Sequence, residues 1–147
     1  MATLYSNLYT RDTSSASGYG YKGPSCVPLP GQVMAVFGTY TGTFSSDTLK
    51  CFKFPAPGCK VLTVGILQSA DLDTDSDFTV DIGFTSDIDA LVAASTGLQA
   101  TTAVELDWSD LAAKGVTAIN DEFLLTRAAG ELEVSGTLRF AVTFIVP

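Results

Sequence analysis

Alternation of apolar and polar residues, the pattern of a β-strand with one buried face, dominates the chain from residue 33 onward. In FTVDIGF (78–84), every second residue from Phe78 to Phe84 is apolar, and GTLRFAVTFIV (136–146) repeats the pattern over a longer run. The segment at 60–68 is apolar on both faces, which predicts a largely buried strand. Further strands are predicted at 33–40, 48–54, 103–108 and 122–127.

Polar connections between these segments predict how the strands are joined. TGTFSSD (41–47) favours a hairpin between the first two strands, and AAGELEVSG (128–136) favours a hairpin between the last two. Helix signals are few: Ser86 and Asp89 resemble a capping box, and WSDLAAKG (108–115) fits one further short turn. We therefore expect an all-β, antiparallel β-sandwich with one or two short helices, a jelly roll being one arrangement of it.

The first 31 residues have a different pattern. They show no sustained period, and Pro24, Pro28 and Pro30 oppose regular structure. Such a segment is an extended arm or a disordered tail, and its tyrosines favour an arm because aromatic residues favour interfaces. We predict an arm at 1–31 that docks on a neighbour and a sandwich domain at 32–147. The expected interface residues are Tyr5, Tyr9, Tyr19, Tyr21 and Leu29.

Composition narrows the classes of partner. Apolar residues make up 46% of the chain, which is typical of a globular protein, and the net charge is −8 with scattered basic residues. Because no basic cluster is present to neutralise phosphates, we expect neither nucleic acid nor an anionic membrane as a partner. The N-terminus lacks the pattern of a secretory signal, so synthesis in the cytoplasm is expected.

An acidic run raises the question of a metal site. Asp71, Asp73, Asp75 and Asp77 occupy alternate positions, as at the start of some calcium loops. An EF-hand beginning at Asp71 fails, because its sixth position is Ser76 instead of Gly and its twelfth is Ile82 instead of Glu. Two alternatives remain: a looser calcium site with ligands from several loops, and a solvated turn in which Asp residues form local hydrogen bonds. The second alternative explains the acidic residues of this region except Asp81, which lies on a predicted strand.

Catalytic chemistry is poorly represented. The chain has no histidine, so the commonest general base is missing, and it has no CxxC, HExxH, GxGxxG or P-loop motif. We expect no enzyme and no cofactor. Cys26, Cys51 and Cys59 are read as inert thiols, although Cys51 and Cys59 flank a turn and a bridge between them depends on their separation.

The run PAPGCKVLTVGILQSADLDTDSDFTVDIGFTSDIDALVAAST (55–96) resembles a recurrent pattern in small virion proteins of tailed bacteriophages. Its parts are a Pro-Gly turn, a V-L-x-V strand, an acidic loop, a T-V-D-I-G strand and a D-x-D-x-L segment. GTLRFAVTFIV is similar to the closing strand of those proteins, so the resemblance covers roughly residues 48–147. It implies a capsid decoration or cement protein on the exterior of the virion, commonly a trimer, whose partners are the major capsid protein and copies of itself.

Two other functions remain open. A phage tail, adaptor or fibre component would share the sandwich and the arm, and would differ only in its position in the virion. A carbohydrate-binding module would place exposed aromatic residues on one sheet face, but Trp108 is the sole tryptophan.

Overall fold

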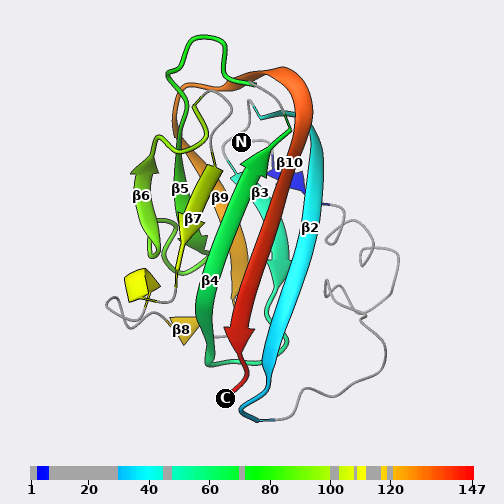
Figure 1. Cartoon of the computed structure of the whole chain (residues 1–147), viewed down its shortest axis with the longest axis vertical. Helices are drawn as coiled ribbons and strands as arrows, with labels where there is room; N and C mark the ends of the chain where they lie inside the picture. Colours follow the sequence, from blue (N-terminus) through cyan, green and yellow to red (C-terminus); the bar gives the residue numbers. More distant parts are fainter. Residues whose placement is uncertain are drawn as a thin grey trace.

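The chain folds into a sandwich of two β-sheets, seen one behind the other in Figure 1. This computed structural model describes residues 3–6, 30–44, 48–69, 72–99, 103–107, 109–111, 117–118 and 121–147. The front sheet has the order β2 (Val33–Phe44), β10 (Leu132–Ile145), β4 (Cys59–Gln68) and β7 (Ala103–Leu106), and β8 (Thr117–Ala118) pairs with β4. The back sheet has the order β1 (Thr3–Tyr5), β3 (Thr48–Lys53), β9 (Glu122–Ala129), β5 (Thr79–Phe84) and β6 (Val92–Ser95).

The strand order is that of a jelly roll. Apart from β1 and β8, the described strands form two four-stranded sheets, β2-β10-β4-β7 and β3-β9-β5-β6, and the chain passes repeatedly from one sheet to the other. All pairings among these eight strands are antiparallel. The predicted antiparallel β-sandwich is therefore confirmed.

A cluster of phenylalanine rings fills the space between the sheets. The ring of Phe52, from β3, lies 5.6 Å from that of Phe123 in β9 and 6.3 Å and 6.2 Å from those of Phe140 and Phe144 in β10. All four side chains are at most 3% exposed. Because strand side chains alternate between faces, the inward rows of both sheets meet in this one core.

Both predicted hairpins are wrong. β2 pairs with β10 while β3 pairs with β9, so β2 and β3 lie in different sheets, and residues 41–44 of the predicted connection belong to β2 itself. β9 and β10 likewise belong to different sheets, although only two residues separate them. Gly130, with φ of 61°, adopts the left-handed conformation that this tight crossing requires. A short polar connection therefore identified a turn but not the partner of either strand.

The helix predicted from Ser86 is absent, because the segment between β5 and β6 forms turns. The amide of Leu91 donates to the carbonyl of Ile82 in β5 (2.9 Å), and the amide of Phe84 in β5 donates to the carbonyl of Asp87 (2.8 Å). These hydrogen bonds tie the segment to β5 and are not those of a helix. The predicted turn at 108–115 is partly described, and Ser109–Leu111 is helical. Asp107 begins it by accepting hydrogen bonds from the amides of Ser109 (2.8 Å) and Asp110 (3.1 Å).

The N-terminal residues that the structure describes belong to the back sheet. β1 pairs in parallel with β3, and the amide of Ser6 donates to the carbonyl of Lys50 (2.9 Å). The hydroxyl of Ser6, which is buried, donates to the carbonyl of Cys51. Residues 7–29 lie outside the described residues, so the division into arm and sandwich stays a prediction.

Asp81 has a structural partner. In the β5–β6 ladder Val80 faces Ser95 and Ile82 faces Val92, so β6 carries one extra residue opposite Asp81. At this bulge Ala94 has φ of 47°, and its amide donates to Oδ1 of Asp81 at 2.7 Å. The carboxylate thus satisfies an amide that the bulge removes from the ladder.

We expect Asp81→Ala to lower the free energy of unfolding by about 0.5–1.5 kcal/mol, the range for a lost hydrogen bond. Asp81→Asn keeps a side-chain oxygen in the same place and should lose less. Urea unfolding of both variants measures the difference. Equal losses would show that the carboxyl oxygen is not what stabilises the bulge.

Candidate interaction surface

The outward face of the front sheet carries two rows of residues set by strand register. In one row Phe37, Ala141, Gly65 and Glu105 lie side by side across β2, β10, β4 and β7. In the next row the order is Thr39, Arg139, Leu67 and Ala103. The two residues in the middle of the first row, Ala141 and Gly65, are therefore the smallest, and they lie between Phe37 and Glu105.

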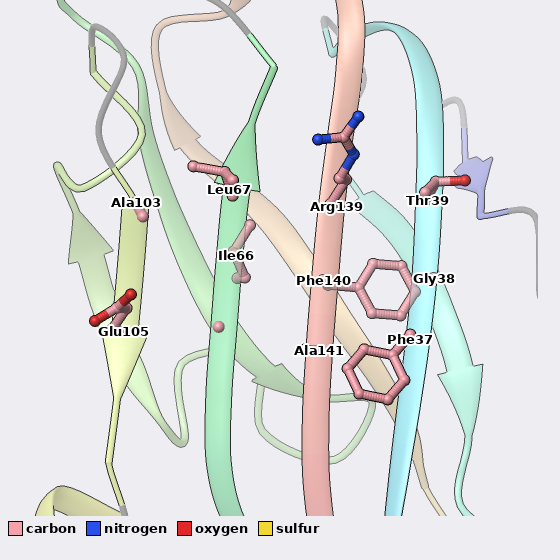
Figure 2. Close-up of a pocket in the computed structure, with 11 residues that line it drawn as sticks. Phe37, Gly38, Thr39, Ile66, Leu67, Ala103, Glu105, Arg139, Phe140 and Ala141 are labelled. Carbon is pink, nitrogen blue, oxygen red and sulfur yellow. The ribbon is translucent and has the colours of Figure 1, made fainter.

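This arrangement produces a hollow of about 400 Å³, which we call the sheet pocket. Figure 2 shows Phe37 on one side of it and Leu67, Ala103 and Glu105 on the other, with Arg139 beside the floor. A Cβ atom built on Gly65 would meet nothing within 4 Å, which confirms that the floor is open. The lining residues are Phe37, Gly38, Thr39, Gly65, Ile66, Leu67, Ala103, Glu105, Arg139, Phe140 and Ala141.

Large apolar side chains on this face are unusually exposed. Phe37 is 70% exposed, Val33 58% and Leu67 44%, and all three belong to β2 or β4 of the front sheet. Single exposed apolar residues are ordinary, but two of these, Phe37 and Leu67, line the hollow, which is typical of an interaction site. The strand predicted at 60–68 is not buried on both faces, because Leu67 points to solvent.

Charges at the pocket are of both signs. Arg139 and Glu105 are exposed, and neither forms an ion pair with another residue that the structure describes. The pocket can therefore hydrogen-bond a polar group, with Arg139 as the donor and Glu105 as the acceptor. The geometry suits an occupant with an apolar body and a polar tip.

The acidic run folds as a loop held by one buried carboxylate. Asp73 is fully buried and accepts hydrogen bonds from the amides of Phe78 (3.1 Å) and Asp77 (3.3 Å), whereas Asp75 and Asp77 are exposed. Asp71 lies outside the described residues. Among the residues that the structure does describe, no group of three or more His, Cys, Asp or Glu side chains is placed to hold a metal ion.

We accordingly predict that calcium does not stabilise the protein. The melting temperature should be the same in excess EDTA and in millimolar calcium, because no third His, Cys, Asp or Glu among the described residues lies beside Asp75 and Asp77 to complete a site. Differential scanning calorimetry provides the measurement, and magnesium serves as the control ion. A melting temperature that rises with calcium alone would contradict this.

Cys51 and Cys59 are free and buried, so the alternative of a bridge between them is excluded in this structure. Burial raises the pKa of both thiols, which keeps them protonated at neutral pH. Cys26 lies outside the described residues.

In a Cys26→Ser variant, the two remaining thiols should therefore resist a thiol reagent such as Ellman's reagent until the protein unfolds. Absorbance would show no fast labelling of the native protein and two thiols per chain in denaturant. Fast labelling of one native thiol would contradict the burial of that side chain.

The predicted interface residues are not placed by the structure. Tyr9, Tyr19, Tyr21 and Leu29 lie outside the described residues, and of Tyr5 only the backbone, in β1, is described. The residues of the sheet pocket were missed because Gly65 and Ala141 are ordinary strand residues in the sequence. One signal in the sequence could have indicated this surface: Phe37 is a large aromatic residue on the face of its strand that points to solvent.

Comparisons with known proteins identify the fold. No protein-family model matches the sequence, and a search of characterised proteins gave no significant match. Within the described residues, no helix is long and apolar enough to cross a membrane. Three solved chains are similar in structure, all from bacteriophage capsids.

A chain from the capsid of Ralstonia phage GP4 is 19% identical and superposes with a TM-score of 0.69 over 99% of both chains. A chain from the capsid asymmetric unit of cyanophage Pam1 is 20% identical, with a TM-score of 0.62 over 91% of this chain and 99% of that one. A chain from the capsid of Helicobacter pylori bacteriophage KHP30 is more distant, with a TM-score of 0.47. The chain therefore shares its fold with components of phage capsids.

Proposed function

We propose that the protein is a structural virion protein of a tailed bacteriophage. In this proposal it is a decoration or cement protein, assembles as a trimer, binds the major capsid protein on the outer surface of the shell and stabilises contacts between shell subunits. It has no enzymatic activity and needs no cofactor. The observation that carries the proposal is the superposition on a capsid chain of Ralstonia phage GP4 over 99% of both chains.

The physical properties of the chain support this role. A cement protein stabilises a shell by burying surface at subunit junctions, and interfaces of that kind favour aromatic residues over charged ones. The sheet pocket and the exposed side chains of Phe37, Val33 and Leu67 offer such a surface. A net charge of −8 keeps the protein from competing for the packaged genome.

Cryo-electron microscopy of virions that contain the chain tests the proposal. We expect density for the jelly roll on the outside of the shell at junctions between capsid subunits. Virions lacking the chain should release their DNA at a lower temperature, as measured by the fluorescence of a DNA-binding dye. Density confined to the tail or to fibres would favour the alternative of a tail, adaptor or fibre component.

A carbohydrate-binding role would place glycans on the exposed aromatic residue of the sheet pocket. A glycan array distinguishes this alternative, because we expect no binding. Specific glycan binding that Phe37→Ala abolishes, together with absence from the shell, would replace the cement proposal.

A further inference from the structure

We propose that strand β2 forms a contact between two copies of the chain, in which β2 of one copy pairs antiparallel with β2 of the other about a twofold axis. The two front sheets then join into one continuous sheet. The inference goes beyond the proposed function, because a twofold contact does not close a trimer and instead joins copies that belong to neighbouring trimers.

The edge formed by β2 differs from the other sheet edges. Among the described strands, β2 has 12 residues, whereas β1, β6 and β7, at the other three edges, have 3 or 4. Proteins protect sheet edges with short strands, prolines, bulges or charged side chains. β2 has no charged residue and no proline, and its register with β10 is unbroken from Val33 to Gly42. A long edge strand without these features is suited to pairing with another strand.

The backbone of β2 presents hydrogen-bonding groups on the side away from β10. In an antiparallel ladder, opposite residues alternate between bonded and non-bonded pairs. Gln32 and Val146 are a bonded pair, because the amide of Val146 donates to the carbonyl of Gln32 (2.9 Å), and the next pair is Val33 with Ile145. From Val33 on, every second residue therefore turns its amide and carbonyl away from β10. These residues are Val33, Ala35, Phe37, Thr39 and Thr41. Among the described strands, none pairs with β2 on this side, which is the margin of the front sheet in Figure 1.

A second copy supplies the strand that this edge requires. The partner must be a long extended strand with an open edge, and it must carry no charge beside the apolar residues of β2. β2 itself meets both conditions, whereas the other described edge strands of a second copy are too short to cover it. Two chains with a net charge of −8 repel each other, and the run from 23 to 46 is the longest without a charged residue. Contact through β2 therefore brings the two copies together where like charges oppose it least.

The register of the contact follows from the outward-bonding residues, which are centred on Phe37. A twofold axis at this point places Phe37 opposite Phe37 of the second copy and Val33 opposite Thr41. Aromatic residues directly opposite each other in an antiparallel ladder stabilise the pairing. The contact also covers the side chain of Phe37, which is 70% exposed in the single chain.

A charge-swap experiment on the full-length protein tests this contact. Phe37→Lys places two ammonium groups opposite each other across the axis, and Phe37→Glu places two carboxylates there. We expect each variant alone to associate about 10-fold more weakly than the wild type, or weaker still, in sedimentation equilibrium at up to about 1 mM, because the aromatic pair is lost and like charges face each other. An equimolar mixture of the two variants should regain most of the association, since Lys then faces Glu.

Ala93→Lys and Ala93→Glu are the matched controls. Ala93 is exposed in β6, one of the short edge strands, and the two substitutions change the net charge by the same amounts as those at Phe37. Neither control variant, nor their mixture, should differ from the wild type. Thermal unfolding followed by circular dichroism verifies that every variant is folded.

Three results would overturn the proposal: no association of the wild type, association that Phe37→Lys leaves unchanged, or loss in both Phe37 variants without recovery in their mixture. The experiment uses no capsids, so these results concern the β2 contact alone. Conversely, absence of the chain from the shell in cryo-electron microscopy, together with recovery in the mixture, would overturn the cement function and leave the β2 contact standing.

Discussion

Phe52→Ala should lower the free energy of unfolding by about 3–5 kcal/mol, the loss typical of removing a buried phenylalanine. Phe52 is fully buried, and its ring lies within 4.9–6.3 Å of the rings of Phe54, Phe123, Phe140 and Phe144. Since these rings come from both sheets, a cavity at this point separates the two layers and cannot collapse by a movement of one strand. Thermal unfolding should occur roughly 6–20 °C lower.

The matched control is Phe37→Ala, the same chemical change at a residue that is 70% exposed on the outer face. It should alter the stability of the dilute protein by no more than about 0.5 kcal/mol. Phe52→Leu retains most of the volume and should fall between the two. Denaturant unfolding followed by far-ultraviolet circular dichroism gives all three values, and similar losses for Phe52→Ala and Phe37→Ala would refute the assigned core.

The strands could be predicted because a strand needs only local information. β5 and β10 were located from alternating apolar residues such as Ile82 and Val142, both of which are fully buried. β6 could not be located in this way, because VAAS lacks strand-forming residues apart from Val92. The capping signal at Ser86 was also misleading, since Leu91 gains a hydrogen bond to Ile82 that a helix would forbid.

The pairing between strands could not be predicted from the sequence, for a different reason. The short connections before β3 and β10 are compatible with a hairpin or with a crossing between sheets, and the choice depends on where apolar faces are buried. Burial of the inward rows of both sheets in one phenylalanine cluster favours the crossing. The sheet pocket follows from that outcome, because Ala141 and Gly65 become neighbours only when β10 pairs with β4.

Gly38→Ala should lower the free energy of unfolding by about 1–3 kcal/mol, the cost of overpacking a core. Gly38 faces Phe140 across the β2–β10 ladder, and a Cβ atom there would lie 2.1 Å from Cζ of the Phe140 ring. The ring has little room to move, because the rings of Phe52 and Phe123 lie 6.3 Å and 6.4 Å from it. A methyl group at Gly38 therefore displaces either the core ring or the edge strand.

Gly65→Ala is the matched control, since it makes the same change on the open side of the front sheet, where a Cβ meets nothing within 4 Å. It should leave the stability unchanged or raise it by up to about 1 kcal/mol, because alanine restricts the unfolded chain more than glycine does. A double-mutant cycle with Phe140→Leu separates a steric effect from a backbone effect. If the clash with Phe140 is the cause, Gly38→Ala will cost less in the Phe140→Leu background, whereas equal costs in both backgrounds would place the cause in the backbone of β2.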